Sequence, residues 1–75
     1  MDAAQCRMAR AALQLGVRDL ALAAEVSPTT VTRLERGETL YARTVEAIRT
    51  ALEAAGVEFI EENGGGPGVR LRVTP

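Results

Sequence analysis

The segment 17–37 restricts the fold of this chain more than any other part of its sequence. Residues 17–24 are good helix formers, and a second helix start follows after only three residues. Ser27 and Pro28 make this start a strong one, because a serine hydroxyl caps a first turn and proline suits the first helical position. Gly37 marks the end of the second helix. The spacing predicts two short helices joined by a tight turn.

Apolar residues recur in this segment at the spacing of two helices that cross at a steep angle. The positions expected on the inner faces are Leu20, Ala24, Val26, Val31 and Leu34, with Ala21 as the small residue at the crossing. The positions expected to face outward are Thr29, Thr30, Thr32, Arg33 and Arg36. Such a second helix can enter the DNA major groove, where short polar side chains and arginines contact base edges. The segment is therefore interpreted as a DNA-binding helix-turn-helix.

Helical patterns flank this segment on both sides. A first helix is expected over residues 3–14, and a last one from Tyr41 or Thr44 to Ala55, with Thr44 as a cap. Two apolar stripes on the first helix compete for the core: Cys6, Ala9 and Leu13, or Met8, Ala12 and Leu15. Periodicity alone does not choose between them. The fold class expected is mainly α, with four helices.

The C-terminal part changes to the two-residue period of β-strands, interrupted by a glycine-rich loop over 63–68. The apolar face of the predicted β-hairpin consists of Val57, Phe59, Val69, Leu71 and Val73, and Glu and Arg side chains are expected to pair on the other face. An isolated two-stranded ribbon is marginal in water. The hairpin must therefore pack on the helices or join the same ribbon of a second subunit. We divide the chain into a helix-turn-helix domain, residues 1–56, and a hairpin, residues 57–75, that we expect to contribute to a dimer interface.

The charge neither supports nor excludes a nucleic-acid partner. Nucleic-acid binders usually carry a basic surplus, whereas this chain has a formal net charge of −1. All nine basic residues are arginines, the better bidentate ligand for phosphate and guanine. The argument for DNA therefore rests on pattern.

Other function classes are disfavoured by composition. Cys6 is the single cysteine and there is no histidine, so an internal disulfide is excluded and a structural zinc site is not expected. We expect Cys6 to be a small core residue, and we expect no catalytic site, metal or cofactor. The sequence shows no signal peptide and no apolar run long enough for a membrane helix, which favours the cytoplasm.

The chain resembles the lambda-type repressor and Cro family, the Xre-like regulators, over about residues 4–56. The matching residues are Leu20-Ala21, Val26-Ser27, Val31, Arg33-Leu34-Glu35 and Gly37, with Arg10 and Leu13 in the first helix. The resemblance implies an all-helical domain that binds a partly palindromic operator as a dimer, usually as a repressor. The hairpin lies outside the common core of the family.

The resemblance also implies particular contacts. Base-facing positions of the second helix are held by Pro28, Thr29, Thr32 and Arg33. Ser27 stands at a phosphate contact, and Arg43 stands where the family's last loop approaches the DNA backbone or minor groove. Arg10 and Glu35 stand where the family pairs an arginine of the first helix with the glutamate that ends the second helix of the motif. This pairing favours the stripe of Cys6 as the buried one.

Two positions depart from the family pattern. Glu25 stands at the turn position that is usually glycine, and a non-glycine residue with positive φ costs on the order of 1 kcal/mol. Val17 stands where glutamine is common and cannot donate to a phosphate, so Arg18 beside it is expected to do so. We add Thr30 as a hydroxyl contact and Arg36 as a phosphate contact at the helix end.

Three functions remain open at this point. The favoured one is a homodimeric transcriptional repressor, with the upstream region of its own gene as a candidate target. The second is an antitoxin-like protein that binds a toxin through its tail and DNA through its helices. The third is a helix-turn-helix used only for protein–protein contact, which predicts no operator binding and no effect of Arg33→Ala.

Overall fold

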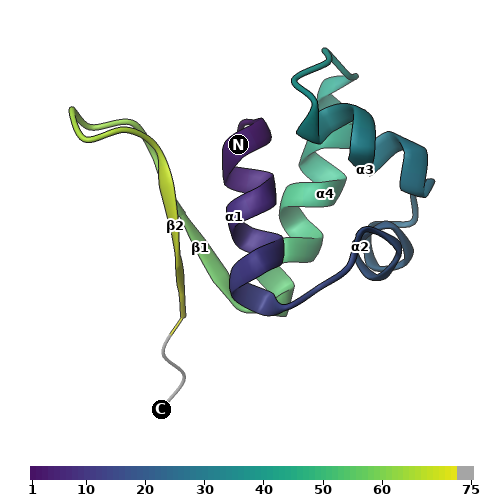
Figure 1. The fold of residues 1–75 in the computed structure, drawn as a ribbon, viewed down its shortest axis with the longest axis horizontal. Coiled ribbons are helices and arrows are strands. Elements are labelled where there is room, and N and C mark those ends of the chain that lie inside the picture. The colour runs from purple at the N-terminus through teal and green to yellow at the C-terminus, as the bar shows by residue number, and fades with distance from the viewer. Residues whose placement is uncertain (73–75) are drawn as a thin grey trace.

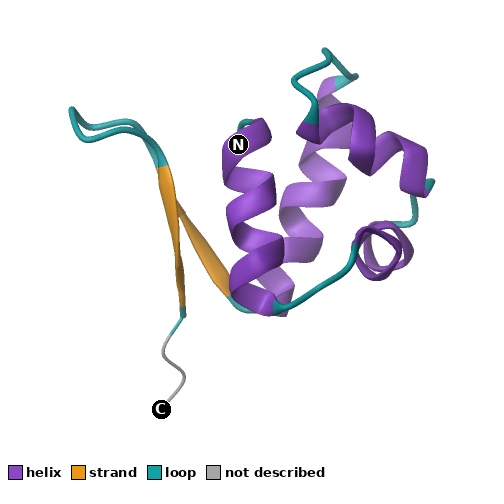
Figure 2. Ribbon diagram, in the orientation of Figure 1, coloured by secondary structure: helices purple, strands orange, loops and turns teal. Residues whose placement is uncertain are grey.

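The fold expected from the sequence is present in the computed structural model, which describes residues 1–72. The elements are α1 (Ala3–Leu13), α2 (Val17–Ala24), α3 (Pro28–Glu35), α4 (Ala42–Ala55), β1 (Val57–Ile60) and β2 (Gly68–Leu71). The protein is mainly helical, with a two-stranded antiparallel hairpin after the last helix (Figure 2). None of the four helices within residues 1–72 is both long enough and apolar enough to span a membrane.

The elements form successive layers. Helix α1 lies beside α4, and the pair α2 and α3 packs on one side of them (Figure 1). The hairpin contacts α1 and α4 from the other side, so the two ends of the molecule are the hairpin and the α2–α3 pair (Figure 1). Whatever α3 presents to solvent is therefore far from the hairpin.

Local hydrogen bonds account for where the helices begin. In α1, Asp2 accepts from the amide of Gln5 at 2.8 Å, and the Gln5 side chain accepts from the amide of Asp2 at 2.9 Å, a reciprocal capping box. In α2, Asp19 accepts from the amide of Gly16 at 2.8 Å. The prediction of Thr44 as a cap is wrong, because α4 begins two residues earlier and Tyr41, which gives no side-chain cap, takes the N-cap position.

The core settles which stripe of α1 is buried. Cys6 and Ala9 have no exposed surface, whereas Met8 is 37% exposed, so the stripe of Cys6 is the inner one. The other buried apolar residues are Leu20, Ala21, Ala24, Val31, Leu34, Ile48, Leu52 and Val57. Except for Val26, which is half-buried, the positions predicted for the inner faces of α2 and α3 all belong to this core.

The hairpin packs on its own chain. The strands pair in the register Val57↔Leu71, Glu58↔Arg70, Phe59↔Val69 and Ile60↔Gly68. Arg70 Nε lies 3.5 Å from Glu58 Oε2, which confirms the expected cross-strand pairing of charges. Val57 is only 1% exposed, and Phe59 and Val69 are half-buried against the core.

The predicted dimer face therefore needs a correction. Val57 is part of the core of its own subunit and is not available to a partner, because β1 follows α4 directly and turns its first side chain inward. Leu71 remains 52% exposed, and Val73 lies outside the described residues. The hairpin packs against α1 and α4 of its own chain, and its pairing with the ribbon of a second subunit stays a prediction.

Two side chains that sequence reasoning did not single out attach the hairpin to the helices. Gln5 is 2% exposed, and its Nε2 donates to the backbone oxygens of Ile60 and Gly68, both at 3.0 Å. Arg49 of α4 places its guanidinium carbon 5.2 Å from the ring centre of Phe59, a cation–π contact. The hairpin is thus held by α1 at one strand end and by α4 at its aromatic residue.

Candidate nucleic-acid interface

The turn between α2 and α3 fixes how α3 is presented. Glu25 ends α2 in the left-handed region, with φ 58° and ψ 43°, and the amide of Val26 donates to the carbonyl of Ala21 at 3.0 Å. Ala21 is 2% exposed where the helices of the motif pack. In Figure 1, α2 is seen end-on while α3 crosses above it. This steep crossing leaves one face of α3 open to solvent.

The strained turn makes a stability prediction. Replacing Glu25 by glycine removes a positive-φ penalty of about 1 kcal/mol but adds freedom to the unfolded chain. We expect Glu25→Gly to raise the free energy of unfolding by about 0.5 kcal/mol, measured by thermal or urea denaturation. Ala23→Gly, two residues earlier in regular helix, is the control and should lower it by about 0.5–1 kcal/mol. Equal losses for both variants would show that the turn carries no strain.

The exposed face of α3 carries most of the side chains proposed to contact DNA. Pro28, Thr29, Thr32, Arg33 and Arg36 are all exposed. Their positions recur one and four residues apart, so they lie on one side of the helix. The Thr32 hydroxyl donates to the carbonyl of Pro28 at 3.2 Å, so its oxygen can still accept a hydrogen bond.

The start of α3 is more tightly organised than the sequence suggests. Ser27 Oγ accepts from the amide of Thr30 at 3.1 Å and lies 2.8 Å from Thr30 Oγ1. This confirms Ser27 as the cap. Thr30 was expected to face outward but is half-buried, because the cap draws its hydroxyl back toward the turn.

An open hollow adjoins this end of α3. Its walls come from the turn before α3, from α3, from the loop that follows it and from the first turn of α4: Val26, Ser27, Thr30, Arg33, Thr39, Leu40, Tyr41 and Thr44. Five of these side chains carry hydroxyls, and one is a guanidinium. A surface of this kind offers hydrogen bonds to a polar backbone such as a chain of phosphates.

The first turn of α4 lies at the edge of this hollow. Arg43 places its guanidinium carbon 5.1 Å from the ring centre of Tyr41, which is 74% exposed. The first turn of α4 contains no acidic residue, and no side chain caps its amides. Positive charge and free amides therefore meet where the sequence predicted a DNA-backbone contact by Arg43.

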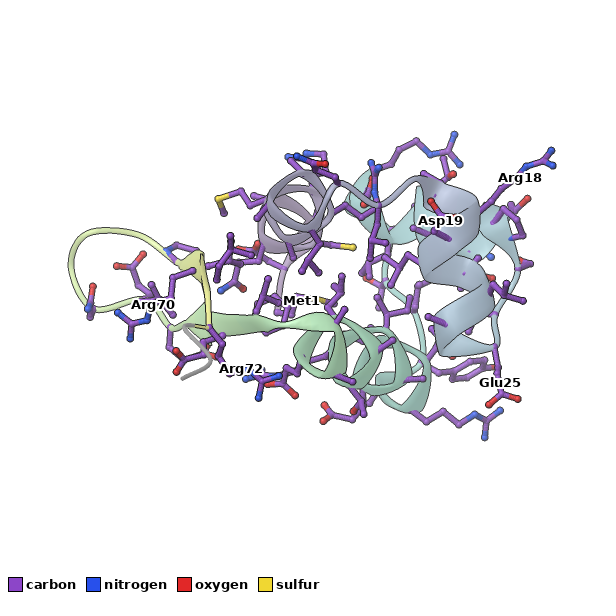
Figure 3. The ribbon with its side chains drawn as sticks, turned by 90° about the horizontal axis from the view of Figure 1, so that it is seen from below. Met1, Arg18, Asp19, Glu25, Arg70 and Arg72 are labelled. Atoms are coloured by element: carbon purple, nitrogen blue, oxygen red, sulfur yellow. The ribbon has the colours of Figure 1, made fainter. Side chains whose placement is uncertain are left out.

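Figure 3 shows the remaining predicted contact, Arg18, and its surroundings. Arg18 projects away from the body of the protein at the start of α2, and Glu25 projects at the other end of the same helix (Figure 3). Arg70 and Arg72 lie on the hairpin at the opposite side of the molecule (Figure 3). Arg18 therefore lies at the end of the molecule formed by α2 and α3, whereas Arg70 and Arg72 lie at the other end.

Arg33 of α3 and Arg36, the C-cap residue of this helix, are both bound to one acid. Glu38 Oε1 accepts from Arg33 Nε at 2.9 Å, and Glu38 Oε2 accepts from Arg36 Nη2 at 3.0 Å. The hydrogen bond from Arg33 is the main reason that the pKa of Glu38 is lowered, with Arg36 adding to it. Glu38 therefore stays ionised beside the exposed face of α3. Sequence reasoning did not identify this residue.

A second ion pair connects the last residue of α3 to α1. Arg10 Nε and Nη2 donate to Glu35 Oε2 and Oε1, each at 2.8 Å, which confirms the predicted structural pair. Cys6 Sγ donates to Glu35 Oε2 at 3.3 Å. Burial and this hydrogen bond raise the pKa of the Cys6 thiol to about 12. Cys6 has no exposed surface, which confirms it as a small core residue. The pair ties the end of α3 to α1.

The chain matches no protein-family model and no curated protein sequence. Within the described residues, no three His, Cys, Asp or Glu side chains cluster in a way that could hold a metal ion. The site consists of an exposed helix face flanked by arginines and hydroxyls.

Proposed function

We propose that this chain is a sequence-specific DNA-binding transcriptional regulator that inserts α3 into the major groove. The observation that carries the proposal is the exposed face of α3, which is held at a fixed angle by α2 and braced by the Arg10–Glu35 pair. Short hydroxyls and an arginine from the N-terminal half of a helix suit base edges, and the flanking Arg18, Arg36 and Arg43 suit phosphates.

The regulator is proposed to act as a homodimeric repressor on a partly palindromic operator. One copy of α3 presents few side chains able to distinguish bases, so a second half-site would supply the rest of the discrimination. Within residues 57–72 of the hairpin, Leu71 is the large apolar side chain that stays exposed, at 52%, and could contribute to such a dimer.

Selection of bound duplexes from random DNA tests this function directly. We expect enrichment of a sequence with two related half-sites, and footprinting upstream of the chain's own gene would then test autoregulation. Failure to enrich any sequence would contradict the proposal. If the chain binds no DNA but co-purifies with a second protein, a helix-turn-helix used for protein–protein contact is favoured instead.

Arg33→Ala is expected to weaken binding to the selected duplex by about 1–3 kcal/mol and to relax the preference at one position per half-site. Arg70→Ala is the matched control, because Arg70 is an exposed arginine on the hairpin, away from α3 (Figure 3). Both variants are compared by fluorescence anisotropy at several salt concentrations. An equal loss on all duplexes with Arg33→Ala would make Arg33 a phosphate contact rather than a base contact.

A further inference from the structure

Glu38 is placed against Arg33 by the way α3 ends. Gly37 adopts φ +89°, a conformation that favours glycine. The amide of Glu38 then donates to the carbonyl of Arg33 at 3.1 Å, and the amide of Gly37 donates to the carbonyl of Leu34 at 2.9 Å. This pair of bonds is the Schellman arrangement, which turns the chain back along the last turn of the helix. The position of the Glu38 carboxylate is therefore set by backbone geometry.

The contact occupies a particular atom of Arg33. Glu38 binds Nε, and within residues 1–72 the two terminal nitrogens, Nη1 and Nη2, donate no hydrogen bond. In the major groove, guanine presents N7 and O6 side by side, and a guanidinium binds them with two N–H groups. With Nε occupied, the pair left for a guanine is the terminal one. Glu38 thus selects one of the two ways in which Arg33 could bind this base.

Glu38 also lowers the charge of the same surface. Arg33 and Arg36 would together present two positive charges, and the carboxylate reduces the sum to one. Attraction to phosphates does not depend on base sequence. Less charge beside the base-contacting side chain therefore weakens binding to all DNA, whereas a fixed orientation of Arg33 favours only duplexes with the right base.

We propose that Glu38 is a specificity-determining residue that positions Arg33 end-on for a guanine and suppresses sequence-independent binding. The inference rests on the proposed function, because it concerns the same helix face. It predicts that removing Glu38 strengthens binding to unrelated DNA while reducing the preference for guanine at the position contacted by Arg33. A purely electrostatic effect of Glu38 would leave that preference unchanged.

The test compares four variants with the wild-type chain. Glu38→Gln removes the charge and weakens the contact. Glu38→Asp keeps the charge but withdraws the carboxylate by one methylene. Glu46→Gln is the matched control, since Glu46 is an exposed acid on α4 that does not touch Arg33. Arg33→Ala locates the position that Arg33 contacts. Affinities are measured by anisotropy for the selected duplex, for versions with each guanine replaced by adenine, and for a scrambled duplex.

We expect both substitutions of Glu38 to reduce the guanine-over-adenine ratio at the Arg33 position by about two- to fivefold, the range given by exposed ion pairs. Glu38→Gln should also raise affinity for the scrambled duplex, whereas Glu38→Asp should not. Glu46→Gln should leave the ratio unchanged. A wild-type ratio in both Glu38 variants, with far-ultraviolet circular dichroism showing intact helices, would overturn the inference.

The outcomes separate the inference from the proposed function. If the wild-type chain selects a sequence but Arg33→Ala alters no guanine preference, the role of Glu38 is overturned and sequence-specific DNA binding by the chain stands. If the wild-type chain distinguishes no duplex from the scrambled one, both the proposed function and the role of Glu38 are overturned.

Discussion

A chain shortened to residues 1–56 is expected to unfold, although it contains all four helices. Val57 is 1% exposed in the core, and its burial contributes about 2 kcal/mol. Phe59 and Val69 pack on the same core and together add a similar amount. A domain of this size has only about 3–5 kcal/mol of stability from its core. Loss of the hairpin therefore removes most of the margin.

Circular dichroism and analytical ultracentrifugation distinguish this expectation from a purely dimeric role of the hairpin. The shortened chain should be unfolded at room temperature and should show no cooperative thermal transition above it. Val57→Ala in the full chain should lower the free energy of unfolding by about 2 kcal/mol. Leu71→Ser is the control, because Leu71 is on the same face of the hairpin but 52% exposed, and it should change stability by less than about 0.5 kcal/mol. A well-folded monomer of residues 1–56 would contradict the prediction.

The helix-turn-helix could be predicted because its signals are local. Ser27 and Pro28 start α3 and Gly37 ends it, and each acts on residues within one turn of itself. The spacing of apolar residues then fixed which faces are buried. The family resemblance implied a positive φ at Glu25, and the structure has φ 58° there. These features depend on short-range geometry, which a pattern of residue types expresses directly.

The surface that the hairpin packs against could not be predicted, because it depends on long-range contacts. Alternation identifies an apolar face but not the surface that covers it, which depends on contacts across more than 50 residues of sequence, such as Gln5 to Ile60. Gln5 gave a partial signal, since Asp2 and Gln5 have capping-box spacing. Its side-chain amide, however, both caps α1 and binds the hairpin, and only the tertiary structure shows the second role.

At the candidate site, the exposed side chains of α3 were predictable and their neighbours were not. Arg33 was identified from its place on α3. Glu38 could have been found by extending the Schellman pattern beyond Gly37, because the residue after such a glycine returns toward the last helical turn. Tyr41, by contrast, is a single exposed aromatic residue whose contact with Arg43 has no sequence signature.

Among the ion pairs of residues 1–72, the Arg10–Glu35 pair is expected to cost the most stability when it is broken. The Glu35 side chain is 9% exposed and that of Arg10 is 23% exposed. Removing one partner of a buried pair costs about 3–5 kcal/mol, and the partial exposure of Arg10 reduces this to roughly 2–3 kcal/mol. We therefore expect Glu35→Gln to lower the free energy of unfolding by about 2–3 kcal/mol in urea denaturation at pH 7.

Further variants show whether the loss comes from the pair. Glu53→Gln breaks the more exposed pair with Arg49 and should cost less than about 1 kcal/mol. The double variant Arg10→Met, Glu35→Leu removes both charges, so it should be more stable than Glu35→Leu alone, in which Arg10 keeps its charge without a partner. If the loss of stability in the double variant equals the sum of the losses in Arg10→Met and Glu35→Leu, the two side chains act independently.

The pH dependence of the wild-type chain gives an independent check on the same pair. The hydrogen bonds from Arg10 are the main cause that lowers the pKa of Glu35. A carboxyl whose pKa is lower in the folded than in the unfolded chain binds fewer protons when folded, so its contribution is complete above the unfolded value of about 4.3 and is lost as the pH falls through the folded value. The difference in stability between the wild-type chain and Glu35→Gln should therefore be constant from pH 6 to 7 and shrink below about pH 4. A difference that stays the same at pH 3 would show that the ionised carboxylate is not what holds α3 against α1.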